Sequence, residues 1–154
     1  MKQDRALLAV DLGLRSGLAL YNAVGGLVWY RSQNFGAKAR LKRAVYRLFQ
    51  EHPAITHVVL EGGGDLGIIW RKEAERRGLE FEQIHAERWR RELLLQRQQR
   101  SGAVAKGYAD RLARQVIVWS GASKPTSLRH DAAEAILIGL WGVWRYDWIE
   151  ELPI

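Results

Sequence analysis

The stretch "LLAVDLGLRSGLALYN", residues 7–22, decides the fold of this chain. It opens within a continuous apolar run, Ala6–Val10, that ends at Asp11, which is typical of a central strand buried on both faces. Two further strand-like runs, Gly17–Asn22 and Leu27–Ser32, are separated by "AVGG", whose glycines suit a tight hairpin. The sequence therefore predicts three antiparallel strands at the start of the chain.

Helices and two short strands are predicted over the rest of the chain. Apolar residues at helical spacing predict a helix over Lys38–His52, with Pro53 after its end. The later elements are strands at His57–Leu60 and Phe81–His85 and helices from a cap at Asp65, over Glu87–Arg97, over Val104–Trp119 and over His130–Trp148. This order predicts an α/β fold with a mixed five-stranded sheet, three strands antiparallel and two parallel, flanked by helices. The 154 residues contain no repeat or linker and are expected to form a single domain, residues 1–154.

The amino-acid composition excludes several classes of protein. The formal net charge is +7 and the pI is about 10.0, so a polyanionic partner or a solvated basic surface is expected. Absence of cysteine excludes disulfides, a thiolate nucleophile and cysteine-ligated zinc. No apolar stretch reaches the roughly 20 residues of a membrane span, and the first residues lack a signal-peptide layout. These features predict a soluble cytoplasmic protein with no membrane partner.

Four carboxylates are the candidates for chemistry. Asp11 and Glu61 each close a predicted strand, and a parallel pairing of those strands would put both at one sheet edge. Asp131 and Glu134 lie three residues apart on one face of the last predicted helix. Glu134 interrupts an apolar run, and a buried carboxylate needs a proton, a cation or a hydrogen-bond partner. Turn formation, simple solvent exposure and helix N-terminal stabilisation are the structural alternatives for these acids.

Cations would explain how four acids could share one sheet edge. Grouped carboxylates repel one another and raise their own pKa values unless cations neutralise them. Oxygen-only ligands suit Mg²⁺, with Mn²⁺ as a substitute. Two such ions about 4 Å apart would clamp the attacking water and the departing oxygen of a phosphodiester. The acids therefore predict metal-dependent phosphodiester hydrolysis.

Three motifs in order, "LLAVDLGLRSGLALYN", "HVVLEGG" and "HDAAEAILIGL", resemble the RNase H-like superfamily and, within it, the RuvC-type Holliday junction resolvases. The resemblance implies a crossover junction endonuclease of DNA recombination and repair, nucleoid-associated, acting as a homodimer on four-way DNA junctions. It implies that Asp11, Glu61, Asp131 and Glu134 are the catalytic metal ligands. The first motif lacks the usual proline, and Gly62 stands where a glutamine is common, so the wider group of phage-type and organellar resolvases fits better than bacterial RuvC itself.

The resemblance also implies roles outside the carboxylates. Lys106 matches a basic residue near the scissile phosphate, and the helix after the fourth strand would lie at the dimer interface. The residues implied at that interface are Leu66, Ile69 and Trp70. His130, beside Asp131, is a candidate for proton transfer or simply a helix-end residue.

A dense basic stretch is expected to contact the DNA backbone. It has one acidic residue over positions 36–52, and its alternative is a solvated helix face. The nominated residues are Lys38, Arg40, Lys42, Arg43 and Arg47, together with Lys106. Trp29, in the predicted hairpin, is a candidate for stacking on unpaired bases.

Two other functions stay open on sequence grounds. One is a RuvX-type nuclease that processes ribosomal RNA, because that class also opens with an Asp-Gly strand turn. The other is a non-catalytic nucleic-acid-binding module with the same fold. Both keep the basic surface but differ from a resolvase in substrate or in metal-dependent cutting.

Overall fold

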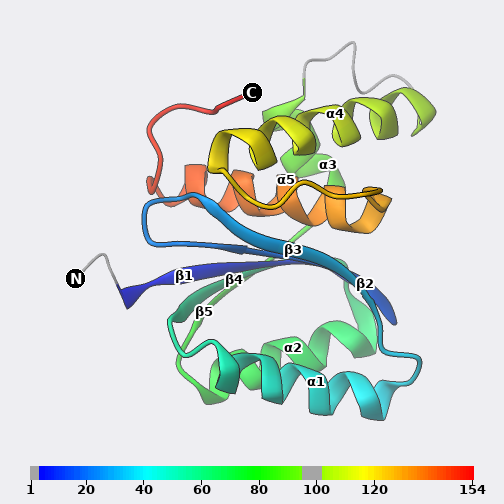
Figure 1. Ribbon diagram of the computed structural model, residues 1–154. Coiled ribbons are helices and arrows are strands. Elements are labelled where there is room, and N and C mark those ends of the chain that lie inside the picture. Colours follow the sequence, from blue (N-terminus) through cyan, green and yellow to red (C-terminus); the bar gives the residue numbers. More distant parts are fainter. Residues whose placement is uncertain (1–3, 95–101) are drawn as a thin grey trace.

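The protein is a three-layer α/β structure, given by a computed structural model that describes residues 4–94 and 102–154, without the side chains of 102–106. A sheet lies between two layers of helices (Figure 1). The elements are β1 (Ala6–Asp11), β2 (Arg15–Tyr21), β3 (Leu27–Asn34), α1 (Lys38–Glu51), β4 (Ile55–Glu61), α2 (Gly64–Arg76), β5 (Glu80–Ile84), α3 (Ala86–Leu93), α4 (Gly102–Ser120) and α5 (His130–Arg145).

The sheet has five strands in the order β3-β2-β1-β4-β5. β1 pairs antiparallel with β2, and β2 with β3, whereas β1–β4 and β4–β5 pair in parallel. The predicted mixed sheet is therefore confirmed. Parallel pairing of β1 with β4 follows from the α1 connection, which carries the chain from the end of β3 back to the start of β4.

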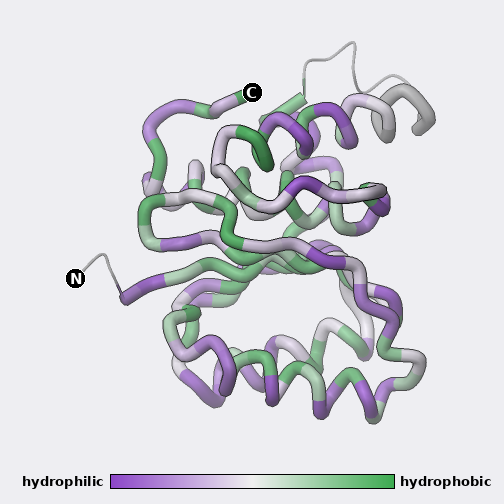
Figure 2. The backbone as a smooth tube through the Cα atoms, in the orientation of Figure 1, coloured by the Kyte–Doolittle hydropathy of each residue, from purple (hydrophilic) through white to green (hydrophobic). Residues whose placement is uncertain are grey.

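Successive side chains of β1 point to opposite faces of the sheet and therefore belong to two separate halves of the core. Leu7 and Ala9 face a cluster built with α4 and α5, whereas Leu8 and Val10 face a cluster built with α1 and α2. All four side chains are fully buried, as expected for a strand covered on both faces. Figure 2 shows the resulting apolar band along the central strands.

Close contact between α5 and the sheet positions the end of the helix that carries the acids. Every residue from Ala132 to Val143 is buried. Gly139 allows the approach, because a Cβ there would lie 2.2 Å from the Tyr21 ring. The Tyr21 hydroxyl donates a hydrogen bond of 2.5 Å to the carbonyl oxygen of Ile136. The helix is thereby fixed over β1 and β2.

Two sequence expectations about helix ends are wrong. Asp65 is not a cap: Gly63 is the N-cap of α2, and Asp65 lies inside its first turn. The last helix ends at Arg145, because Asp147 adopts a positive φ of 61° that turns the chain. Trp148 then lies outside the helix and packs edge-on against His57, with ring centroids 5.0 Å apart. In the part of the chain that the structure describes, no helix has the length and apolarity to span a bilayer.

Candidate active site

The ends of β1 and β4 bring Asp11 and Glu61 side by side. The two residues are partners in the parallel register of these strands. The backbone N–H of Leu12 continues this pairing, with a 3.0 Å hydrogen bond to the carbonyl oxygen of Glu61. Because both strands point the same way, their carboxyl ends meet at one edge of the sheet. Two of the four predicted acids therefore come from adjacent strands.

The first turn of α5 lies against the same edge. Gly17, the antiparallel partner of Asp11, touches the backbone of Asp131, where a Cβ at Gly17 would lie 1.8 Å from the carbonyl oxygen. The Asp131 carboxylate accepts a hydrogen bond of 2.8 Å from the Ser32 hydroxyl and one of 2.8 Å from the backbone N–H of Ala132. β2 and β3 therefore fix Asp131 beside the ends of β1 and β4.

Substitution of Gly17 by alanine tests this close approach. The added Cβ has no room without moving α5, so we expect the free energy of unfolding to fall by about 1 to 3 kcal/mol. Gly107→Ala in α4 is the matched control, since no described atom lies within 4 Å of the place its Cβ would take and alanine favours helix by about 0.5 to 1 kcal/mol. Urea denaturation of both variants measures the difference. Equal stability of the two variants would contradict the placement of α5.

Burial, with mutual repulsion added to it, raises pKa values within the cluster. Burial raises the pKa of Asp11 from 3.8 to about 8, and the charges of Glu61, Glu134 and Asp131 add to that increase, against a smaller opposite effect of Arg90. Burial also raises the pKa of Glu61, with a further contribution from Glu134. The other three predicted acids thus lie close enough to influence the pKa of Asp11. An added cation at this edge would lower the repulsion.

Glu134 is the most buried member of the cluster, with an exposed fraction of 2%. Its Oε1 atom accepts a hydrogen bond of 2.5 Å from Nη2 of Arg90 and lies 2.9 Å from Nε2 of His130. Its Oε2 atom is buried and, among the described residues, has no hydrogen-bond partner. One carboxylate oxygen therefore remains available for a further ligand.

These residues fit a hard divalent cation by donor chemistry. Within residues 4–94 and 102–154 no three His, Asp or Glu side chains converge at metal-binding geometry. The four acids nevertheless offer only carboxylate oxygens as donors. Their burial and mutual repulsion raise the pKa of Asp11. Oε2 of Glu134 has no hydrogen-bond partner among the residues described. Oxygen donors under mutual repulsion suit Mg²⁺ or Mn²⁺. The predicted pair of ions and the ligand roles stay a prediction.

Arg90 and Ser32 are site residues that sequence reasoning missed. Ser32 lies near the end of a strand, and the residues around it carry no motif. Arg90 belongs to a stretch in which Arg88 and Arg91 are also basic, so nothing in the sequence distinguishes it. Its relation to Glu134 arises only because α3 packs on α5. Lys106 falls among the residues whose side chains are not described, so its predicted role stays a prediction.

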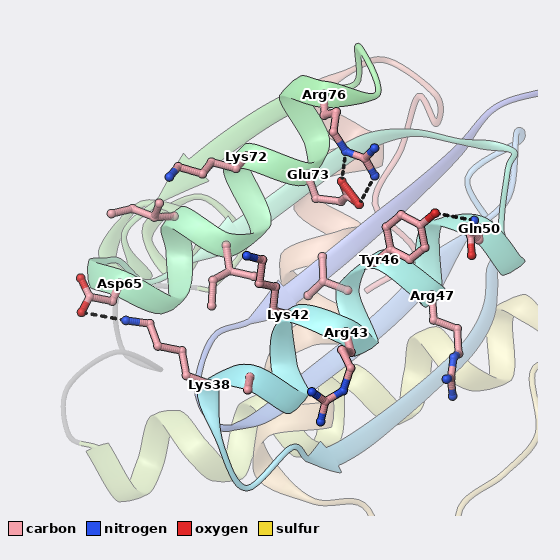
Figure 3. A pocket seen from close by; sticks show the side chains of 14 residues that line it. Lys38, Lys42, Arg43, Tyr46, Arg47, Gln50, Asp65, Lys72, Glu73 and Arg76 are labelled. Atoms are coloured by element: carbon pink, nitrogen blue, oxygen red, sulfur yellow. Dashed lines mark hydrogen bonds and ion pairs between the residues drawn. The ribbon is translucent and has the colours of Figure 1, made fainter.

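The predicted basic surface forms one wall of a groove between α1 and α2 (Figure 3). The groove measures about 1210 Å³, and all five nominated residues of α1 are exposed. Lys38 pairs with Asp65 at 3.2 Å at one end of the groove. The other cations lining it are Lys42, Arg43, Arg47, Lys72 and Arg76. Arg40 is exposed on the same helix but does not line the groove.

The implied interface residues on α2 differ in accessibility. Trp70 is fully buried and meets Phe49 edge-on at 6.0 Å, so its assignment to an interface is wrong. It fills the core because it faces the sheet. Leu66 and Ile69 are partly buried against the same core, and Ile69 lines the groove. Trp29 is also partly buried, and the guanidinium of Arg31 lies 4.3 Å from its ring centroid, which occupies one stacking face.

The sheet order and the helix layers define an RNase H-like α/β fold. Among solved structures, RuvC of T. thermophilus in complex with a Holliday junction substrate is similar over 93% of this chain and 96% of that chain, with a TM-score of 0.66 and 13% identity. An intasome of simian T-cell lymphotropic virus in complex with PP2A regulatory subunit B56 gamma aligns over 93% of this chain and 49% of that chain, with a TM-score of 0.37 and 9% identity. No protein-family model and no curated protein matches the chain.

Proposed function

We propose that this chain is a metal-dependent, structure-selective endonuclease that resolves four-way DNA junctions by symmetric two-metal phosphodiester hydrolysis. The observation that supports the proposal is the grouping of Asp11, Glu61, Asp131 and Glu134, from β1, β4 and α5, near one sheet edge, where the charges of the other three acids raise the pKa of Asp11. The fold is that of RuvC, whose solved structure contains a Holliday junction substrate. Burying carboxylates that repel one another costs free energy unless cations bind between them, and such costly groups are typical of functional sites.

Each side chain of the site has a separate task in this proposal. Bound Mg²⁺ would supply an activated water and Lewis-acid stabilisation of the departing oxygen. Asp11, whose pKa responds to the charges of Glu61 and of the α5 pair, would hold the metal together with these acids. Ser32 holds one oxygen of Asp131 and thereby orients that carboxylate. His130, 2.9 Å from Glu134 and partly exposed, is placed to pass a proton between the site and solvent.

The basic wall of the α1–α2 groove supports a DNA partner. Lys42, Arg43 and Arg47 have no acidic ion-pair partner among the described residues, so their charges are free for phosphates. Phosphate contacts release counterions and make affinity strongly dependent on salt. They position the DNA without reading its sequence.

Removing the positive charges of this wall should weaken the binding of junction DNA and make the binding less dependent on salt concentration. For a variant with Lys42, Arg43 and Arg47 all changed to glutamine, we expect the slope of log K against log salt to fall by about 1 to 3. The control changes Arg111, Arg114 and Lys124 to glutamine, which removes the same charge from the opposite side of the sheet. Fluorescence anisotropy with a labelled junction gives both slopes. A larger loss in the control would place the DNA on the α4 side instead.

Symmetric cutting of two opposed strands requires two active sites, so the proposal includes an isologous dimer. The partly buried Leu66 and Ile69 and the 44% exposed Ile68 are the apolar side chains of α2 that could meet a partner. Light scattering after gel filtration measures the mass. A monomer in the presence of junction DNA would exclude paired cutting by one assembly.

Substrate choice is the test of the proposed function. The protein is incubated with a four-way junction, a three-way junction, a linear duplex and an RNA hairpin, each with Mg²⁺ and with EDTA. Symmetric nicks in the four-way junction alone, lost in EDTA, are the expected result. Equal cutting of linear duplex would contradict structure selectivity.

Two other outcomes correspond to the alternative functions. Cutting of the RNA hairpin without cutting of junctions would identify a ribosomal-RNA nuclease of the RuvX type. Tight junction binding without metal-dependent cutting would identify a non-catalytic module. The specific observation that favours the module is the pairing of Glu134 with Arg90, which occupies one of the oxygens that a metal would need.

A further inference from the structure

Arg90 is the guanidinium nearest to the buried end of the carboxylate cluster. It donates to Oε1 of Glu134, whose side chain is 3% exposed, across 44 positions of sequence. It also lowers the pKa of both Asp11 and Glu61, so its charge acts on these two acids as well as on Glu134. Hydrogen bonds between ions are about twice as strong as neutral ones, which makes this contact the main compensation for burying Glu134.

The backbone around Arg90 is firmly held, whereas its side chain is partly free. Trp89, the preceding residue, is fully buried and anchors α3 in the core. The indole N–H of Trp141 in α5 donates to the carboxylate of Glu92, which ties the two helices together. The Arg90 side chain itself is 34% exposed. It can therefore rotate towards solvent or a phosphate without unpacking α3.

A divalent ion at the predicted site needs the same carboxylate that Arg90 occupies. With the guanidinium in place, the described residues contain no convergent group of three ligands. Oε2 of Glu134 has no partner within that part of the chain, so only one of its two oxygens is available without displacing Arg90. Two positive charges beside one carboxylate repel each other. Metal binding and the Arg90 contact are therefore mutually antagonistic.

We propose that Arg90 is the resident counter-ion of the carboxylate cluster, that it competes with divalent cations for Glu134, and that cation binding releases it. This inference rests on the proposed function, because it takes the carboxylates to be metal ligands. Arg90 is in this sense a positioning residue that holds Glu134 until a cation replaces it. A DNA phosphate would offer the released guanidinium a new bidentate partner.

The test compares Mn²⁺ binding by the protein alone, without DNA. Free Mn²⁺ is measured by electron paramagnetic resonance at the same pH for every protein. We expect Arg90→Gln to bind Mn²⁺ about tenfold more tightly than the unaltered protein, because a charge-assisted contact no longer opposes the ion. Arg90→Lys, which keeps the charge, should retain the weaker affinity.

The matched control is Arg91→Gln, an exposed neighbour on the same helix with the same change in net charge. It should bind Mn²⁺ as the unaltered protein does, which separates competition at Glu134 from general electrostatics. Equal or weaker Mn²⁺ binding by Arg90→Gln, with normal binding by the control, would overturn the counter-ion role alone. Absence of Mn²⁺ binding in all four proteins would overturn the metal site and the proposed function with it.

A measurement on the unaltered chain covers the case in which Arg90→Gln does not fold. The Nε–Hε resonance of Arg90, assigned as the signal missing from Arg90→Lys, is followed in ¹⁵N spectra during addition of Mg²⁺. Release from Glu134 predicts a saturable shift of this signal, whereas the Arg91 signal stays in place. An unmoved Arg90 signal at saturating Mg²⁺ would contradict release.

Discussion

Asp11→Asn is expected to abolish junction cleavage while leaving junction binding intact or stronger. The charges of the other three acids all act on Asp11, and asparagine removes its charge without changing its size. Loss of one central ligand removes several kcal/mol of transition-state stabilisation, so the rate should fall by about a thousandfold or more. Binding should persist because the proposed phosphate contacts come from the basic surface and not from Asp11. Gel-based cleavage and anisotropy on the same junction measure both quantities.

Asp110→Asn serves as the control for this prediction. Asp110 lies on the surface of α4, with its side chain 45% exposed, and pairs with Arg114 at 3.0 Å. Such a surface pair contributes only about 0.3 to 0.5 kcal/mol, so cleavage should be unchanged. Cleavage by Asp11→Asn within tenfold of the unaltered protein would contradict a central role for Asp11. Parallel loss of cleavage and binding would indicate misfolding, which circular dichroism detects.

Stability without metal is expected to fall as the pH rises from about 4 to about 8. The pKa of Asp11 is about 8 in the folded protein, against an ordinary value of 3.8, so the native state holds a proton that the unfolded state releases. Between these values the unfolded state binds fewer protons, and the free energy of unfolding therefore decreases with pH. Since Asp11 is only partly buried and coupled to its neighbours, the total loss is about 2 to 4 kcal/mol.

Denaturation in EDTA at pH 5, 6.5 and 8 measures this effect, with Asp11→Asn as reference. Asparagine mimics the protonated acid, so the stability advantage of the variant over the unaltered protein should be small at pH 5 and should grow up to pH 8. Subtracting the two curves removes the opposite contribution of His57, whose pKa is lowered by burial. Parallel curves would show that Asp11 does not titrate with a raised pKa. Mg²⁺ at pH 8 should restore stability to the unaltered protein only.

The fold could be predicted because its signals are local. Apolar runs of strand length ending at Asp11 and Glu61 located β1 and β4, and helical spacing located α1 within one residue at its end. The hairpin glycine Gly25 has a φ of 85°, as the turn requires. Helix ends were less predictable. Asp65 has the right chemistry for a cap, but Gly63 takes that position because α2 begins earlier than its apolar pattern.

The candidate site could be predicted in part. The i, i+3 spacing of Asp131 and Glu134 and the strand-end positions of the other two acids were enough to predict that they lie near one sheet edge, whereas their role as metal ligands stays a prediction. The partners of these acids were not predictable. Ser32 reaches Asp131 across 99 positions of sequence, and Arg90 reaches Glu134 across 44. Neither contact leaves a periodic trace in the sequence.

The sequence by itself determined the strands, the helices and the acids at their ends, because these depend on side-chain periodicity and on which residues tolerate a turn. Only the tertiary structure decided what neutralises those acids. Packing of α3 against α5 places Arg90 on Glu134, and contact of Gly17 with the start of α5 brings Asp131 to β2. Such pairings depend on the relative placement of whole elements, which local residue preferences do not specify.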